Sequence, residues 1–399
     1  MIALLLATST SLAADDAEPK ENRAVGGSMA GWGDVPVATD DERNGGMTHL
    51  WAQIQVWGTV WDQDVDAQAD PATYGDPEAD PGFALNRARF GMDGFVAMRN
   101  LPGRHQVDYA IALGLAAPYD VLTAEDTDVQ LVDGFGRWAL PTDMGTTSLS
   151  VGMQRVPFGR ENNISSATIP FQESGVASNW MAPSRGVGVV AGQSLRFGEG
   201  EQPVTVLARV GGFQPGDPFG TDGPQMLFDG RLELSIGDTY TTWNKDLKSA
   251  LGVGGAALVR TEPGTTVSSV EGDLLARYKV VTLVGEVMAS TISPVDTDIQ
   301  QPGVVEQTHQ LGWTAMLSGW IPVKKASGIE PAVRLSSFDD ATALESSGDV
   351  MILHGGATWR NLLPRTDLGA GYVHRAELHT EVPNDTVRLW VQVRPDARL

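Results

Sequence analysis

The sequence predicts an all-β fold: a transmembrane antiparallel β-barrel of about sixteen strands whose third long loop folds inward. Three observations support this prediction. From Leu50 onward, the chain repeats segments of roughly ten residues with alternating polarity, the length that a tilted strand needs to cross a bilayer. The breaks between these segments alternate between long and short nearly throughout. Charged residues recur near the middle of the polar faces, which suits a wet interior of opposed charges.

Composition narrows the classes of protein that remain. The chain has 399 residues, 42% of them hydrophobic, enough for two ordinary domains or one large barrel. It has no cysteine, so neither a disulfide nor a thiolate metal site is possible. The formal net charge of -22 repels DNA and RNA, so no nucleic-acid partner is expected. No stretch approaches the roughly 18 uninterrupted apolar residues of a membrane helix, so a membrane-spanning form must be a barrel.

The N-terminal region divides into two expected segments before the barrel. Residues 1–14, MIALLLATSTSLAA, predict a signal peptide, because a short apolar run ends on small residues. The alternative for this segment is a buried N-terminal strand or helix. Residues 15–47 are acidic and rich in Gly and Asp, which predicts a disordered segment. We assign residues 48–399 to the barrel.

Each expected strand is a run of alternating polarity that ends at a break. The break at 62–82 is long and acidic, the one at 100–104 is short, and 116–127 is long again. The connection 237–247 departs from this rhythm, since it should be short and is not. The sixteen expected strands cover 50–60, 87–99, 106–113, 129–140, 147–156, 186–197, 204–210, 228–236, 250–259, 268–278, 281–289, 308–321, 329–337, 350–359, 368–375 and 387–393.

The connection between the fifth and sixth expected strands is the most distinctive stretch. Pro157 ends the strand, and the polar chain that follows to Ser184 has no period of 2 or 3.6. A loop that long counts against a compact soluble domain. A large barrel can instead fold it into the lumen, so we predict a constriction loop at 157–184.

Charges on the polar faces separate a membrane barrel from a soluble β-protein. A soluble sandwich, jelly roll or propeller also alternates, but it needs large aliphatic side chains on its inner face. Here the apolar faces are modest, and the polar faces also include Glu271 and Glu330. The predicted pore-lining and constriction residues are Arg87, Arg89, Asp93, Arg160, Arg185, Arg209, Arg231, Asp273, Arg277, Glu286 and Arg334.

Motifs of known chemistry are absent from the sequence. It contains no GxSxG, HExxH or GxxxxGK[ST] pattern, and its six histidines are scattered without ligand spacing. The acidic stretch from Asp62 to Asp70 resembles a calcium loop but has Ala67 where the turn glycine belongs and Thr73 where the closing glutamate belongs. We therefore predict no enzyme activity, no cofactor and no metal site.

Five segments carry a family resemblance, and their order and spacing are its specific part. They are NRARFGMDG (86–94), LSVGMQRVPFGRENNISS (149–166), VEGDLLARY with VTLVGEV (270–287), LGWTAMLSGWIP (311–322) and IEPAVRLSSFD (329–339). They resemble strands of the phosphate-selective porin O and P family. The resemblance implies a trimeric outer-membrane porin of sixteen strands whose third loop narrows the channel. Its implied partners are outer-membrane lipid, lipopolysaccharide, and small hydrophilic solutes or ions.

The sequence departs from that family in the residues expected to bind phosphate. Phosphate-specific members use a ladder of arginines and clusters of lysines, because fixed cations replace the hydration that an anion loses in a narrow neck. The expected constriction loop and its end carry Arg160 and Arg185 but no lysine. An arginine-lined wall therefore remains the expectation, without a lysine trap.

The function expected from these observations is passive diffusion of small hydrophilic solutes or ions, including anions such as phosphate, through a water-filled channel. A second hypothesis is a closed or narrow outer-membrane barrel that acts as an adhesin or surface-binding scaffold. The third is a soluble secreted β-protein, which lacks the resistance of membrane barrels to cold SDS.

Overall fold

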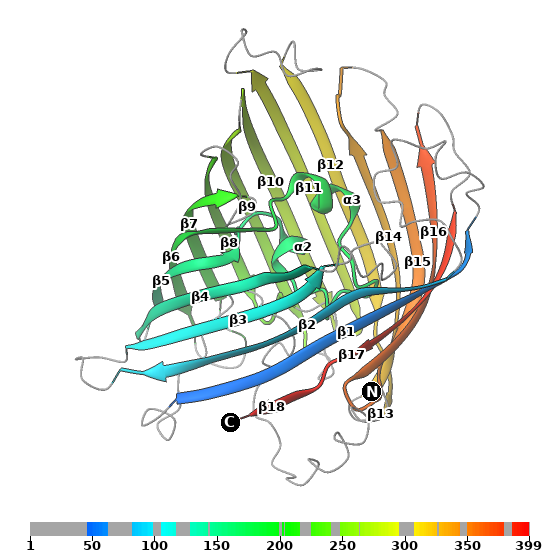
Figure 1. Cartoon of the computed structure of the whole chain (residues 1–399), viewed down its shortest axis with the longest axis horizontal. Coiled ribbons are helices and arrows are strands. Elements are labelled where there is room, and N and C mark those ends of the chain that lie inside the picture. The colour runs from blue at the N-terminus through cyan, green and yellow to red at the C-terminus, as the bar shows by residue number, and fades with distance from the viewer. Residues whose placement is uncertain are drawn as a thin grey trace.

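The computed structural model is a closed antiparallel β-barrel with a segment folded into its lumen (Figure 1). The structure describes residues 46–62, 82–98, 105–116, 128–142, 144–198, 202, 204–215, 225–240, 248–262, 264–294, 307–324, 327–343, 349–378 and 385–398. The predicted signal peptide at 1–14 and residues 15–45 of the predicted disordered segment lie outside this part, as does the calcium-like stretch beyond Asp62.

Adjacent strands around the barrel pair antiparallel, and β1 pairs with both β2 and β17, which closes the sheet. The strands are β1 (Gly46–Asp62), β2 (Gly82–Ala97), β3 (Gln106–Ala116), β4 (Asp128–Thr142), β5 (Gly145–Arg155), β6 (Arg185–Phe197), β7 (Val204–Pro215), β8 (Met226–Ile236), β9 (Ala250–Glu262), β10 (Thr265–Tyr278), β11 (Val281–Pro294), β12 (Thr308–Gly319), β13 (Ile321–Lys324), β14 (Ser327–Asp339), β15 (Val350–Leu363), β16 (Thr366–Glu377), β17 (Thr386–Val393) and β18 (Asp396–Arg398).

These eighteen segments make sixteen barrel strands. β13 continues β12 in the same register on β14, since Ser318 pairs with Ala332 and Ile321 with Ile329. β18 likewise continues β17 along β1. The predicted antiparallel barrel of about sixteen strands is thereby confirmed. Because the number is even, the start of β1 and the end of β18 lie at one end of the barrel, which we call the terminal end; the opposite end is the loop end.

Alternating side chains face outward and into the lumen. Arg209 and Arg231 are buried on the inner side of neighbouring strands, whereas Val210 and Leu232 are exposed on the outer side. Apolar side chains outside and charges inside reverse the arrangement of a soluble β-protein and match a strand that faces lipid on one side and a lumen on the other. The alternative of a soluble fold with a dry core is therefore wrong.

The predicted constriction loop lies inside the barrel, between β5 and β6 (Figure 1). It contains two short helices that the sequence did not predict, α2 (Arg160–Asn163) and α3 (Val176–Met181). α3 packs against β11, β12 and β14. Within the part of the chain that the structure describes, no helix has the length and apolarity to cross a membrane.

Strand boundaries differ from the sequence predictions mainly by length. β1 begins at Gly46, two residues before the predicted barrel boundary, and most strands extend past the alternating stretch into their turns. Those extensions are rich in Gly, Thr and Pro, whose side chains carry no clear polarity pattern. Backbone pairing with neighbouring strands, rather than the pattern, extends them.

Candidate functional site: the constriction loop and its cavity

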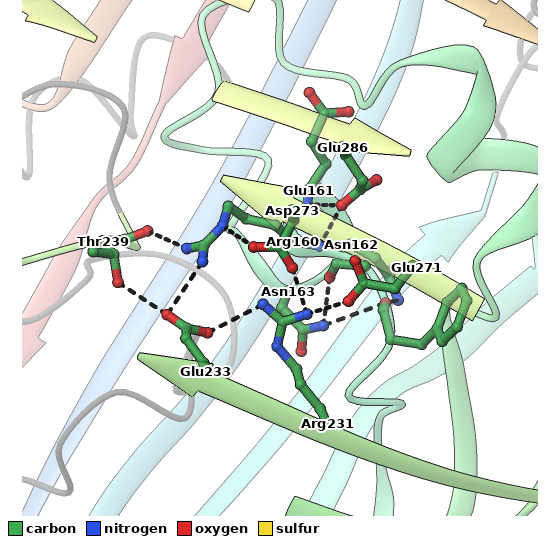
Figure 2. Close-up of polar contacts among 12 residues, drawn as sticks. Arg160, Glu161, Asn162, Asn163, Arg231, Glu233, Thr239, Glu271, Asp273 and Glu286 are labelled. Carbon is green, nitrogen blue, oxygen red and sulfur yellow. Dashed lines mark hydrogen bonds and ion pairs between the residues drawn. The ribbon is translucent and has the colours of Figure 1, made fainter. Parts of the chain in front are cut away.

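One side of the constriction loop is clamped onto an acidic wall formed by β8, β10 and β11 (Figure 2). The Nε atom of Arg160 in α2 lies 2.6 Å from Oδ1 of Asp273, and its Nη2 lies 3.3 Å from Oε1 of Glu233. Arg231 of β8 contacts Glu233, Glu271 and Asp273 from the wall itself. Two arginines thus share three carboxylates, and Arg160 is only 1% exposed. This residue is an anchor of the loop.

A fourth wall carboxylate holds the start of the loop. Glu286 accepts hydrogen bonds from the backbone N–H groups of Arg160 and Glu161 and from the hydroxyl of Ser178. Glu161 in turn accepts the N–H of Gly175 at 2.6 Å, which ties α2 to the start of α3. Gly159 makes the approach possible: its φ is 76°, and a Cβ there would lie 2.8 Å from Cε of Met288.

The other side of the loop is held by the opposite wall. Arg360 of β15 donates to the carbonyls of Ala167 and Thr168 at 3.2 and 2.9 Å, and it also pairs with Glu330 and Asp367. These bonds satisfy loop carbonyls that would otherwise be buried without partners. The loop is therefore fastened at both sides of the lumen.

Beside Arg360, the side chain of Phe171 in the loop packs against the barrel wall. The Phe171 ring stacks on the ring of His354 with centroids 3.7 Å apart, and it meets the Trp390 ring edge-on. The adjacent Glu173 carboxylate is 3.4 Å from Nη1 of Arg388 and 3.8 Å from Nη2 of Arg334. One loop carboxylate thus faces arginines from β14 and β17.

Residues 237–240, the described start of the long β8–β9 connection, lie in the lumen near the terminal end. The carbonyl of Thr239 accepts from Nη1 of Arg160 at 3.1 Å, and the hydroxyl of Tyr240 donates to Glu233 at 3.2 Å. Arg209 donates to the same hydroxyl at 3.2 Å. Burial, with the nearby Glu233 carboxylate, raises the pKa of Tyr240 to about 12, so this hydroxyl stays protonated near neutral pH. The described start of this connection therefore supports the loop through Thr239.

A cavity of about 920 Å³ remains between the loop and the wall formed by β2, β4, β5 and β6. Five arginines and one carboxylate border it, together with neutral polar and apolar side chains. The charged lining residues are Arg87, Arg89, Arg155, Arg185, Arg260 and Glu161.

The arginines of this cavity differ in their ion-pair and hydrogen-bond partners. Arg185 makes a two-pronged pair with Asp133, at 3.0 and 3.3 Å. Arg155 and Arg87 donate to carbonyls of the loop. Arg89 makes no hydrogen bond or ion pair with the described part of the chain, and it lies in the repulsive field of the other three. The cavity wall is therefore net positive, with Arg89 available to a solute.

The predicted pore residues fall into three groups, and their contact with a solute remains a prediction. Arg87, Arg89 and Arg185 border the cavity, whereas Asp93 lies elsewhere, 3.3 Å from His49. Residues that hold the loop or the β8–β9 connection are Arg160, Arg209, Arg231, Asp273, Arg277, Glu286 and Arg334.

Sequence reasoning did not select several residues of the site. Arg155 ends a strand just before Pro157, and its position next to an expected loop was the only available signal. Glu161 and Glu173 lie within the loop, where no periodicity assigns a direction to a side chain. Arg360 was placed in a tight break, yet it is the last inward-facing position of β15 in contact with the loop.

Groups suited to catalysis or metal binding are few in the described residues. Carboxylate oxygens of Asp339, Asp340 and Asp349 lie within 4.8 Å of one another at the loop end. Clusters of this kind are common on acidic surfaces, and nothing else there points to a cation. The described site offers hydrogen bonding and charge, without an arrangement of nucleophile and base.

Comparison with known proteins identifies the fold. No family model matches the chain, and no curated protein matches its sequence. Among solved structures, outer-membrane-expressed OmpT of Vibrio cholerae has a TM-score of 0.55 at 10% identity, over 88% of this chain and 98% of that one. An anion-selective porin from Comamonas acidovorans gives 0.52 at 13% identity, over 89% and 98%. The outer-membrane channel DcaP of Acinetobacter baumannii gives 0.52 at 11% identity, over 88% and 98%.

These similarities, with the closed barrel and its apolar exterior, confirm the predicted outer-membrane β-barrel at the level of the fold. The chain has the architecture of outer-membrane porins and channels. At such low identity the selectivity of those proteins does not transfer.

Proposed function

We propose that this protein is an outer-membrane porin through which small hydrophilic solutes or ions diffuse passively, with a preference for anions. The observation that carries the proposal is the net positive cavity between the constriction loop and the β2–β6 wall, where Arg89 has no described ion-pair partner. Fixed guanidinium groups compensate an anion for the water it loses in a narrow passage. Phosphate belongs to this class of solute, as the resemblance to the phosphate-selective porins O and P implies.

The net charge of the chain does not oppose this preference. Most wall carboxylates at the loop anchors are bound to Arg160, Arg231 or Arg360, so they are not available to attract cations. Selectivity follows the charge that a solute meets locally, because fields are focused within a low-dielectric channel.

The proposed surroundings are outer-membrane lipid and lipopolysaccharide, and the proposed assembly is a homotrimer. One solved OmpT neighbour is described as a trimer form, which supports this assembly by analogy. Crosslinking in detergent, followed by electrophoresis without heating, should give a trimer band.

Planar-bilayer recording tests the channel. Purified protein should give stepwise conductance, and the reversal potential in a KCl gradient should have the sign of an anion-preferring pore. Arg89→Gln with Arg185→Gln should shift it toward cation preference, whereas Arg196→Gln, at an exposed position of β6, should leave it unchanged. Deleting 157–184 should enlarge the conductance. Folded protein that stays electrically silent would refute the channel.

A closed or narrow barrel that binds a surface partner is the second candidate. The observation that favours it is the fastening of the loop to both walls, with Arg160 and Arg360 fully buried. A silent bilayer together with saturable binding to lipopolysaccharide or another surface component would favour this candidate.

A further inference from the structure

The cavity has an apolar side that passive passage of phosphate does not use. Val132 of β4 lines it together with the arginines, as do Ile164 and Ile169 of the constriction loop. Inorganic phosphate gains nothing from such side chains, since it is hydrated on every side. A solute that carries both a negative charge and an apolar body would contact both kinds of wall.

The charged and apolar groups are adjacent. Gly114 of β3 lies between them: a Cβ there would be 2.8 Å from Cγ2 of Val132 and 3.4 Å from Cγ of Arg89. Because Gly114 has no side chain, nothing from this position separates the valine from the stem of Arg89. A carboxylate at the Arg89 guanidinium therefore has an apolar surface within the length of one small molecule.

The opposite side of the cavity carries one competing charge, that of Glu161. The loop contributes Asn162, Ser166 and Ser174, which are neutral, and Glu161, whose carboxylate already accepts the N–H of Gly175. The volume of about 920 Å³ lies within the range of small-molecule sites. An organic anion thus meets five arginines and one carboxylate, that of Glu161, which is only 2% exposed.

We propose that the cavity selects organic monocarboxylates with a compact apolar body, such as benzoate, over hydrophilic anions such as gluconate and inorganic phosphate. This inference deepens the proposed porin function and rests on solute reaching the cavity from the loop end. The carboxylate binds at Arg89, and the apolar body lies on Val132. Burial of a modest apolar area there should make benzoate bind about five- to tenfold more tightly than gluconate.

Equilibrium dialysis of the full chain in detergent, with labelled benzoate, gluconate or phosphate, tests the proposal without requiring conductance. The unmodified protein should bind benzoate at least about fivefold more tightly than gluconate. Val132→Thr keeps the shape of the wall but not its polarity, and should reduce that ratio. Arg89→Gln should weaken both anions. The control Val323→Thr changes an exposed position at the terminal end and should keep the ratio.

Equal binding of benzoate and gluconate by the unmodified protein, or no binding of either, would overturn the proposal. An unchanged ratio in Val132→Thr would also overturn it. If that variant fails to fold, the ratio in the unmodified protein and the loss of affinity with Arg89→Gln still decide the matter. A barrel that conducts KCl without preferring benzoate refutes this inference alone, whereas benzoate binding without conductance refutes the channel alone.

Discussion

Replacing Arg160 by methionine tests whether the acidic wall holds the constriction loop. Methionine keeps much of the length of the side chain but removes the charge and all donors. The substitution therefore removes the interactions at 2.6 Å with Asp273, at 3.3 Å with Glu233 and at 3.1 Å with the carbonyl of Thr239. Because Arg160 is 1% exposed, water does not replace them without displacing the loop.

The expected magnitude follows from the charges that remain. Removing one partner of a buried ion pair costs about 3–5 kcal/mol, because the other charge stays buried without compensation. Arg231 still contacts both Asp273 and Glu233, which places the expected cost near the lower end, about 3 kcal/mol. A change of that size shifts the equilibrium between anchored and released loop by roughly a hundredfold.

Two measurements report this shift. Single-channel recordings should show larger and noisier currents for Arg160→Met, since the released loop obstructs the lumen only part of the time. In gels run after stepwise heating in SDS, the folded band should disappear at a lower temperature. Arg196→Met, at an exposed position, is the matched control and should behave as the unmodified protein. Adding Asp273→Asn and Glu233→Gln should restore part of the stability, because Arg231 then pairs with a single wall carboxylate, that of Glu271.

Arg160 would not be an anchor of the loop if Arg160→Met kept the conductance, the noise and the heating profile of the unmodified protein. A heating profile of Arg160→Met that stays the same after adding Asp273→Asn and Glu233→Gln would also contradict the anchor role. The destabilisation would then not arise from the wall carboxylates.

Two further substitutions probe the second anchor and the β8–β9 connection. Glu173→Gln removes the carboxylate that faces Arg334 and Arg388, and should destabilise the loop by about 1–2 kcal/mol while increasing anion preference in the reversal potential; a cation shift would contradict it. The raised pKa of Tyr240, about 12 against an ordinary value near 10, means that the folded state favours the neutral hydroxyl. The stability that the Tyr240 hydroxyl contributes is complete below pH 10 and is lost as the pH rises through 12. Over this range the folded band in SDS gels should therefore weaken less steeply for Tyr240→Phe than for the unmodified protein. Equal slopes would contradict this role of Tyr240.

Several features of the site could be predicted because they depend on local pattern. The period of two assigned Arg87, Arg89, Arg209 and Arg231 to the lumen side, since a strand alternates its faces whatever its neighbours are. The same logic could not distinguish a side chain that borders a cavity from one that fastens a loop. That difference depends on what lies across the lumen, and Arg160 shows it, because its partners are 73 and 113 residues further along the chain.

The sequence by itself determined the class of the molecule: alternation from Leu50, breaks of alternating length and one long irregular connection require strands that close on themselves with charges inside. Closure of the barrel brings together strands that are far apart in the sequence. Only the tertiary structure decided that the loop is fastened at Asp273 and Glu286 on one side and at Arg360 on the other. It also decided that the remaining space borders Arg89 and Val132. The physical reason is that strand pattern is set by local backbone geometry, whereas the position of a loop is set by the few long-range hydrogen bonds and ion pairs that satisfy its buried polar groups.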